Sequence, residues 1–160
     1  MTTEYISGYL EAVSRVKDIL TPYVGGTNQF FAISKDKGKS TVENLIIHLH
    51  SYLAYNIQVK ADLVDKLSIE PIANWQDNLA ELIKDWTCDS ELESFRGRNG
   101  TLLSKYLVKF LLKDFFRDQS VEVYRLLPHW GDWPWGDHMS EEFLFETEEK
   151  IFIMHLGESS

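Results

Sequence analysis

The spacing of apolar residues predicts helices through the first two thirds of the chain. From Glu4 to Leu20, apolar residues recur at intervals of three and four, which is the period of an amphipathic helix. A second helix is predicted to begin near Thr41, because Ser40 and Glu43 have the spacing of a capping box. This second run forms one long helix or two shorter ones, and Glu70-Pro71 ends it, since proline disfavours helical geometry in the preceding residue.

Two more helical patterns follow. From Trp75 to Trp86 the large apolar residues share one face, with Asn74 in the position of an N-cap. The segment from Thr101 to Phe116 is predicted to be a helix with a broad apolar face, formed by Leu102, Leu103, Tyr106, Leu107, Phe110 and Leu111. Three lysines repeat every four residues along this segment, which predicts a solvated basic stripe that could also meet acidic groups. The run of residues 96–100 between the two patterns is typical of an exposed loop.

Alternating apolar residues predict strands in the last third of the chain and one strand earlier. The predicted strands are Gln29–Ser34, Val121–Leu127, Glu142–Thr147 and Lys150–Leu156, with Glu148-Glu149 at the tip of a hairpin. The aromatic residues of the last two strands fall on one face of each, which indicates a core. The fold class is therefore α+β, with N-terminal helices packed on a C-terminal antiparallel β-sheet.

Composition limits the possibilities further. A length of 160 residues with 44% hydrophobic and 26% charged residues fits one globular domain over residues 1–160. Cys88 is the only cysteine, so an intrachain disulfide and a cysteine-based zinc site are excluded. The first residues show no secretory leader, and no apolar run approaches the length of a membrane span. We therefore expect a cytoplasmic protein without membrane contact.

Charge is distributed unevenly along the chain. The formal net charge is −9, and from Asp118 onward ten acidic residues stand against only Arg125 and Lys150. A negative surface repels phosphate backbones, so we do not expect nucleic acid as a ligand. The imbalance favours a basic protein partner, although an acidic surface that binds nothing gives the same pattern.

A Trp-rich segment, residues 129–138, precedes the two C-terminal strands. Its glycines and proline interrupt regular structure, so three tryptophans lie where the backbone turns. Tryptophan is enriched at the centres of protein interfaces, and neighbouring acids orient a basic partner. Alternatively, the segment packs as a lid over the sheet. The predicted partner-binding residues are Trp130, Asp132, Trp133, Trp135, Asp137, Glu141, Glu146, Glu148 and Glu149.

Candidate chemistry is sparse. We predict no catalytic residue, because no phosphate-binding glycine pattern, nucleophile elbow or zinc-protease helix occurs in the sequence. His129, Asp132, Asp137 and His138 could serve a metal-dependent or small-ligand enzyme, but they match no established ligand spacing, and we expect no metal or other cofactor. The glutamates near the hairpin are expected at the surface, and His155 is expected to be structural.

The closing pattern provides a resemblance. Glu142-Phe143-Leu144-Phe145-Glu146, followed by the strand from Lys150 to Gly157, resembles the hairpin ending of bacterial toxin-immunity proteins of the contact-dependent and polymorphic-toxin type. The resemblance implies a small acidic inhibitor that neutralises a basic cognate toxin, such as a nuclease. Acids of this kind would offset the positive charge with which nucleases hold their substrate. An adaptor or chaperone for a basic protein segment is the alternative, and the sequence does not indicate an oligomeric state.

Overall fold

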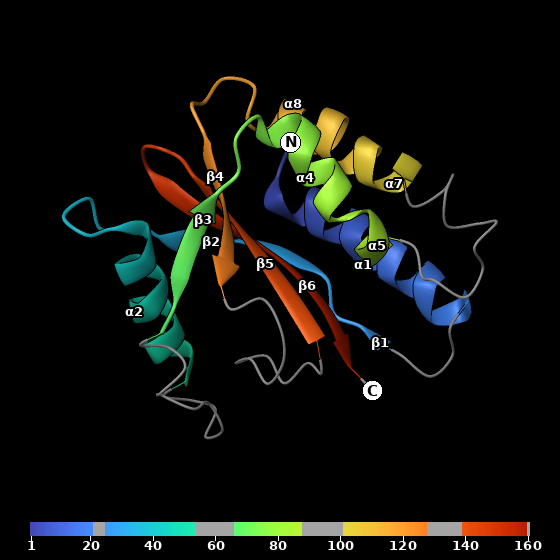
Figure 1. The fold of residues 1–160 in the computed structure, drawn as a ribbon, viewed down its shortest axis with the longest axis horizontal. Coiled ribbons are helices and arrows are strands. Elements are labelled where there is room, and N and C mark those ends of the chain that lie inside the picture. Colours follow the sequence, from blue (N-terminus) through green and yellow to red (C-terminus); the bar gives the residue numbers. More distant parts are fainter. Residues whose placement is uncertain (21–24, 54–65, 88–100, 128–138, 160) are drawn as a thin grey trace.

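The structure is a computed structural model that describes residues 1–20, 25–53, 66–87, 101–127 and 139–159. In this part of the chain, six strands form one antiparallel sheet, and helices lie on both of its faces (Figure 1). The predicted α+β class, with N-terminal helices against C-terminal strands, is confirmed. No helix among the described residues is long and apolar enough to cross a membrane.

The sheet is built around a C-terminal hairpin. Its strands are β1 (Gly25–Gly26), β2 (Gln29–Ser34), β3 (Ser68–Pro71), β4 (Glu122–Leu127), β5 (Met139–Glu146) and β6 (Lys150–Ser159). The order is β1–β6–β5–β4–β3, and β2 pairs with β6 alongside β1. The four predicted strands are confirmed. The sequence pattern missed β3, a short edge strand that ends at Pro71, because its four residues show no alternation and proline is typical of a turn or a sheet edge.

Seven helical segments are described. They are α1 (Thr3–Leu20), α2 (Thr41–Leu53), α4 (Trp75–Leu82), α5 (Lys84–Thr87), α7 (Thr101–Tyr106), the π-helix η2 (Leu107–Leu112) and α8 (Lys113–Phe115). The capping box before α2 is confirmed: the Ser40 amide donates to Glu43 Oε2 at 2.7 Å, and the Glu43 amide donates to Ser40 Oγ at 3.2 Å. Asn74 precedes α4 as predicted, but its side chain makes no capping bond. Its backbone is left-handed (φ 47°), and its carbonyl oxygen instead accepts hydrogen bonds from the amides of Asp77 and Asn78.

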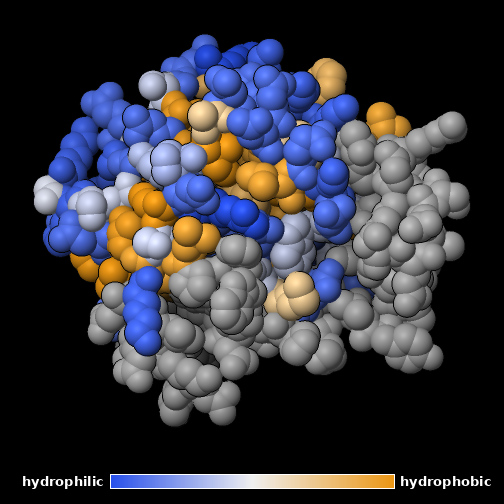
Figure 2. Space-filling model, viewed as in Figure 1, coloured by the Kyte–Doolittle hydropathy of each residue, from blue (hydrophilic) through white to orange (hydrophobic). Residues whose placement is uncertain are grey.

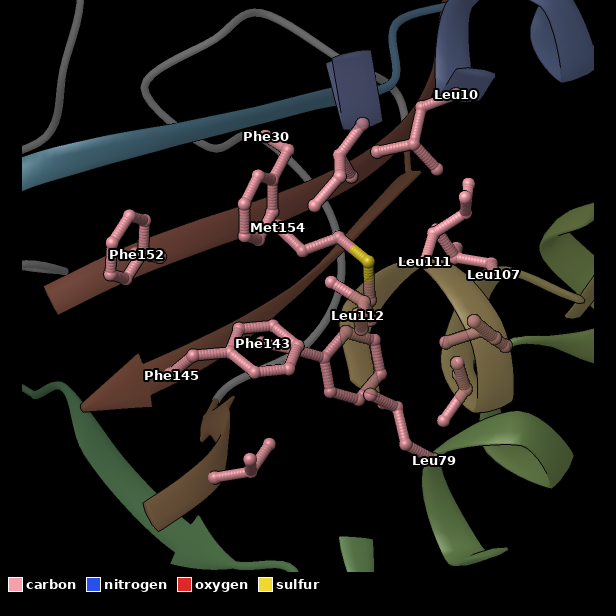
Figure 3. Packing of buried hydrophobic residues seen from close by; sticks show 14 of the residues in the cluster. Leu10, Phe30, Leu79, Leu107, Leu111, Leu112, Phe143, Phe145, Phe152 and Met154 are labelled. Atoms are coloured by element: carbon pink, nitrogen blue, oxygen red, sulfur yellow. The ribbon is translucent and has the colours of Figure 1, made fainter. Parts of the chain in front are cut away.

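The larger core lies between the sheet and the helices α1, α4, α5 and η2. Phe30, Phe116, Phe145 and Phe152 pack at its centre, with ring centroids 5.4 to 6.5 Å apart. Figure 3 shows Met154 reaching from β6 toward the leucines of the helical layer. The faces predicted for the aromatic residues of β5 and β6 are therefore confirmed. On the face seen in Figure 2, hydrophilic residues cover much of the described surface, and apolar residues are visible at its centre and toward its left side.

A smaller core lies on the opposite face of the sheet, under α2. Leu45 and Leu49 of α2 pack there against Ile33, Leu144 and Ile153, all of which are buried. The side chains of successive strand residues point to opposite faces, so β5 and β6 contribute to both cores. The sheet is thus covered on both sides, which explains why its central strands are apolar over nearly their whole length.

The helix predicted from Thr101 to Phe116 differs from its expected geometry at the centre. Residues 107–112 form π-helical turns with i to i+5 hydrogen bonds, which are wider than α-helical turns and change the set of side chains that face the core. Leu107 and Leu111 are buried as predicted, but Leu102, Tyr106 and Phe110 are exposed. The prediction that all of these residues share one buried face is therefore wrong.

Candidate partner-binding surface

The β5–β6 turn projects two acidic side chains from the sheet. Thr147 closes the turn: its amide and its hydroxyl both donate to the carbonyl oxygen of Lys150 at 2.9 Å, and the Lys150 amide donates to Thr147 Oγ1 at 3.1 Å. Glu148 and Glu149 between them are exposed, as the hairpin prediction placed them. A short turn fixed by three hydrogen bonds gives these carboxylates a defined position without burying them.

A groove of about 470 Å³ runs between this turn and the chain connecting α8 to β4. We call it the hairpin groove. It is lined by Asp118, Gln119, Ser120, Thr147, Glu148, Glu149, Lys150 and Phe152. Three carboxylates therefore border one opening, with a single lysine and an aromatic ring beside them. Sequence reasoning missed Asp118 as a member of this surface, because it is separated from the hairpin by about thirty positions in the chain.

The carboxylates of the hairpin groove are weakly engaged. Glu148 lies 3.6 Å from Lys37, but its side chain is 89% exposed, and Asp118 lies 3.2 Å from the exposed Arg117. Exposed pairs of this kind contribute little, because water competes for both charges. Glu149 forms no ion pair with any described residue. The groove thus presents negative charge that an incoming cation can meet.

Glu146, at the end of β5, has a different environment. Its carboxylate lies 2.7 Å from Lys35 Nζ and accepts a short hydrogen bond from the Thr41 hydroxyl. Burial alone raises the pKa of Glu146, but the hydrogen bonds from Lys35 and Thr41 and the lysine charge outweigh it, so the pKa lies below its ordinary value. This carboxylate joins the hairpin to the start of α2, so its partners lie within the chain.

Glu141 and Glu142 are buried, which corrects the expectation that the glutamates near the hairpin lie at the surface. Glu141 faces the larger core, where Trp86 Nε1 donates to Oε2 at 2.6 Å and Arg125 Nη2 lies 2.5 Å from Oε1. The Arg125 contact is an ion pair without the alignment of a hydrogen bond. Glu141 therefore connects β4, β5 and α5 internally, and its carboxylate is not available to a partner.

Glu142 faces the opposite side of the sheet and meets His155. The Glu142 Oε1 atom is 2.9 Å from His155 Nδ1, and both side chains are almost fully buried. The Thr27 hydroxyl lies 3.5 Å from His155 Nε2. The expectation of a structural histidine is confirmed. The other carboxylate oxygen of Glu142 is buried and has no hydrogen-bond partner among the described residues. The strand register could have revealed this pair, because residues 142 and 155 are direct cross-strand neighbours.

Apart from Glu146, the described acids of the predicted surface thus lie near opposite ends of β5. Glu148 and Glu149 follow its last residue, whereas Glu141 lies near its start, beside the end from which residues 128–138 continue. The other predicted partner-binding residues lie outside the described part of the chain: Trp130, Asp132, Trp133, Trp135 and Asp137. His129 and His138, considered as metal ligands, also lie outside it. Among the described residues, no group of three or more His, Cys, Asp or Glu side chains could hold a metal ion.

Comparison with known proteins gives few matches. No protein-family model matches the chain, and no curated protein matches it. Two crystal structures of citrus MAF1 are similar in structure. The first has a TM-score of 0.47 and 15% identity, and the match covers 95% of this chain and 99% of that chain. The second, in another crystal form, has a TM-score of 0.43 and 14% identity, with 99% of each chain covered.

Proposed function

We propose that this chain is a small acidic inhibitor that binds and neutralises a basic protein, with a bacterial toxin of the nuclease type as its partner. The observation that carries the proposal is the hairpin groove, where Asp118, Glu148 and Glu149 border one opening. Two elements distant in sequence, the α8–β4 connection and the β5–β6 turn, contribute to it. The toxin assignment itself rests on the resemblance of the C-terminal hairpin to immunity proteins.

The lining of the groove suits a lysine or arginine side chain. Long basic side chains place their aliphatic stem along apolar surface and keep the charged head among polar groups. Phe152 offers such a surface beside the three carboxylates. The net charge of −9 would also draw a basic partner toward the surface and raise the association rate. Both features favour a partner whose binding face is rich in lysine or arginine.

We include the Trp-rich segment in the proposed interface as a second contact. Tryptophan supplies large contact area at interface centres, and Asp132 and Asp137 would extend the negative charge around it. The segment lies between β4 and β5 in the sequence and outside the described residues.

Co-expression tests the proposal directly. A basic toxin domain encoded beside this chain should be retained by the tagged chain during purification, and the chain should restore growth to cells that express the toxin. Retention and protection should both weaken as salt is raised, because the attraction is electrostatic. Unchanged toxicity together with no retention would overturn the proposal.

Charge-neutral variants locate the interface. The triple variant Asp118→Asn, Glu148→Gln, Glu149→Gln should raise the Kd for the basic partner by roughly 10- to 100-fold, since each surface charge contributes up to about 1 kcal/mol. The matched control is Glu70→Gln, Glu81→Gln, Asp85→Asn, three exposed acids on other elements with the same change in net charge. The control should change the Kd much less. Equal effects in the two triple variants would contradict the groove as the contact.

A basic peptide separates an inhibitor from an adaptor. An adaptor or chaperone for a basic segment should bind a short lysine-rich peptide nearly as tightly as the whole partner protein. An inhibitor that covers a folded active site needs the folded domain, so the peptide should bind far more weakly. Isothermal titration of both ligands against the same preparation distinguishes the two functions.

A further inference from the structure

An exposed apolar stripe runs between α1 and α7, on residues that the sequence pattern predicted to be buried or left unassigned. We call it the α1–α7 stripe, and it consists of Tyr5, Tyr9, Leu102, Tyr106 and Phe110. Four of these side chains are large and open to water, with exposed fractions of 58% for Tyr5, 64% for Leu102, 45% for Tyr106 and 63% for Phe110. They make up half of the eight large hydrophobic residues exposed in the described part of the chain.

Ring contacts show that the stripe is continuous across the two helices. The Tyr9 and Tyr106 rings are 5.5 Å apart, and Tyr106 stacks on Phe110 at 5.6 Å. The Tyr9 hydroxyl donates to the Leu103 carbonyl oxygen at 3.0 Å, which fixes the two helices against each other. From the ordinary surface of such side chains, the exposed apolar area is roughly 400–500 Å². A patch of this size commonly marks a protein interface.

Opposite charges flank the stripe. On α1, Glu4 and Glu11 are exposed and seven positions apart, so they share one side of the helix, away from the buried Ile6 and Leu10. Glu11 pairs with Arg15 at 2.6 Å. The basic row is made by three exposed lysines, Lys105 of α7, Lys109 of η2 and Lys113 of α8. Lys109 pairs with Asp77 of α4 at 2.7 Å, which places it on the α4 side of η2. Among the described residues, Lys105 and Lys113 form no ion pair. The surface thus has an acidic edge, an apolar centre and a basic edge.

This arrangement is complementary to itself. A two-fold axis that runs along the stripe places the acidic edge of one copy against the basic edge of the other, while the apolar centres meet. The two helices run in opposite directions, because Ser7 near the start of α1 and Phe115 near the end of α8 both contact Phe30. Glu4 therefore lies at the level of Lys113, and the two-fold arrangement brings Glu4 of one copy toward Lys113 of the second copy.

We propose that the α1–α7 stripe is a homodimer interface, in which two copies pack apolar centre on apolar centre with opposite charges paired along both edges. The apolar centre supplies about half of the roughly 800 Å² per partner that a standard stable interface buries, and the charged rows supply the remainder. The hairpin groove does not include any residue of the stripe, so this proposal stands independently of the proposed function.

Sedimentation equilibrium of the full chain tests the proposal. A concentration-dependent monomer–dimer equilibrium is expected, and a monomer at every accessible concentration would overturn it. Leu102→Glu and Phe110→Glu should each raise the dimer Kd by roughly tenfold or more, because a charge replaces an apolar contact at the centre. The matched control, Ile47→Glu, changes a residue of α2 that is 49% exposed and lies off the stripe. It should leave the Kd unchanged, and a dimer insensitive to all three changes would contradict the stripe.

A charge exchange tests the two-fold arrangement separately. Glu4→Lys and Lys113→Glu should each weaken the dimer by about two- to fivefold, as expected for a surface ion pair. The double variant should recover most of the affinity, because the pair is restored with reversed signs. Loss in both single variants without recovery in the double variant would overturn the arrangement. Circular dichroism should show unchanged folding throughout, since all the altered side chains are exposed.

Discussion

The two ends of β5 carry carboxylates in opposite environments. At its start, Glu141 and Glu142 are buried on the two faces of the sheet and contact Arg125, Trp86 and His155. Beyond its last residue, Glu148 and Glu149 project into water around the hairpin groove. All four belong to one acidic stretch of the sequence, within nine positions of one another.

The comparison shows that the position in the strand, and not the local charge density, decides the role of each carboxylate. A side chain in the middle of a covered sheet must be buried on one face or the other, so Glu141 and Glu142 need internal partners. A two-residue turn is not covered by a neighbouring sheet or helix, so the side chains of Glu148 and Glu149 remain exposed to water. The first pair holds the fold together, and the second remains available for recognition.

The largest effect should come from breaking the Glu142–His155 pair. His155→Leu should lower the free energy of unfolding by about 3–4 kcal/mol, because a fully buried carboxylate is left without its partner. Urea unfolding monitored by circular dichroism measures the loss. The double variant Glu142→Leu, His155→Leu removes both polar groups and should recover most of it. A cost below about 1 kcal/mol for the single change would show that the pair does not hold the fold.

The second effect concerns Glu141 on the other face. Glu141→Leu should lower the free energy of unfolding by about 2–3 kcal/mol, because Arg125 loses its ion pair and the Trp86 indole loses its acceptor. Glu141→Gln is the matched control: its amide oxygen can still accept from Trp86, so only the charge opposite Arg125 is lost. It should cost about half as much. Equal losses of stability in Glu141→Leu and Glu141→Gln would mean that the Trp86 hydrogen bond does not contribute to the stability of the fold.

Much of the fold could be predicted from the sequence, because its signals are local. The capping box at Ser40 and Glu43 and the alternation in β5 and β6 each depend on neighbours within a few positions. The edge strand β3 could not be predicted in this way, since it is defined by pairing with β4 more than fifty positions later. The π-helical turns at residues 107–112 lie against α1 and α4, and the periodicity of one segment gives no sign of this tertiary packing.

The candidate surface could be predicted only in part. The hairpin tip at Glu148 and Glu149 follows from strand spacing, but Asp118 joins the groove through the tertiary arrangement of α8 and β4. The burial of Glu141 and Glu142 could not be predicted either, because strand alternation alone does not show which faces of the sheet are covered by helices. The number of acidic residues in the sequence therefore overestimates the acidic surface, because some of these carboxylates contact other residues inside the fold.

Glu146, between the two groups, should show an intermediate effect. Lys35→Met removes both its ion pair and a hydrogen bond to the Thr147 carbonyl, and should cost about 1–2 kcal/mol. Because the pKa of Glu146 is lowered in the folded state, its contribution is complete above the ordinary value of 4.5 and is lost as the pH falls through the lower folded-state pKa. Unfolding curves at descending pH should therefore lose less stability below pH 4.5 in Lys35→Met than in the wild type. Equal losses of stability with falling pH in the two proteins would contradict the stabilisation of the Glu146 carboxylate by Lys35.

The smallest effect on stability is expected at the hairpin tip. Glu148→Gln with Glu149→Gln should change the free energy of unfolding by no more than about 0.5 kcal/mol, because both side chains are exposed and the Lys37 contact is weak. The same variant should slow association with a basic partner and flatten its dependence on salt, measured by stopped-flow mixing at several ionic strengths. A marked loss of stability would mean that the tip also holds the fold, and the contrast between the two ends of β5 would then disappear. Unchanged stability with slower association would establish that the same residue type serves packing at one end of a strand and recognition at the other.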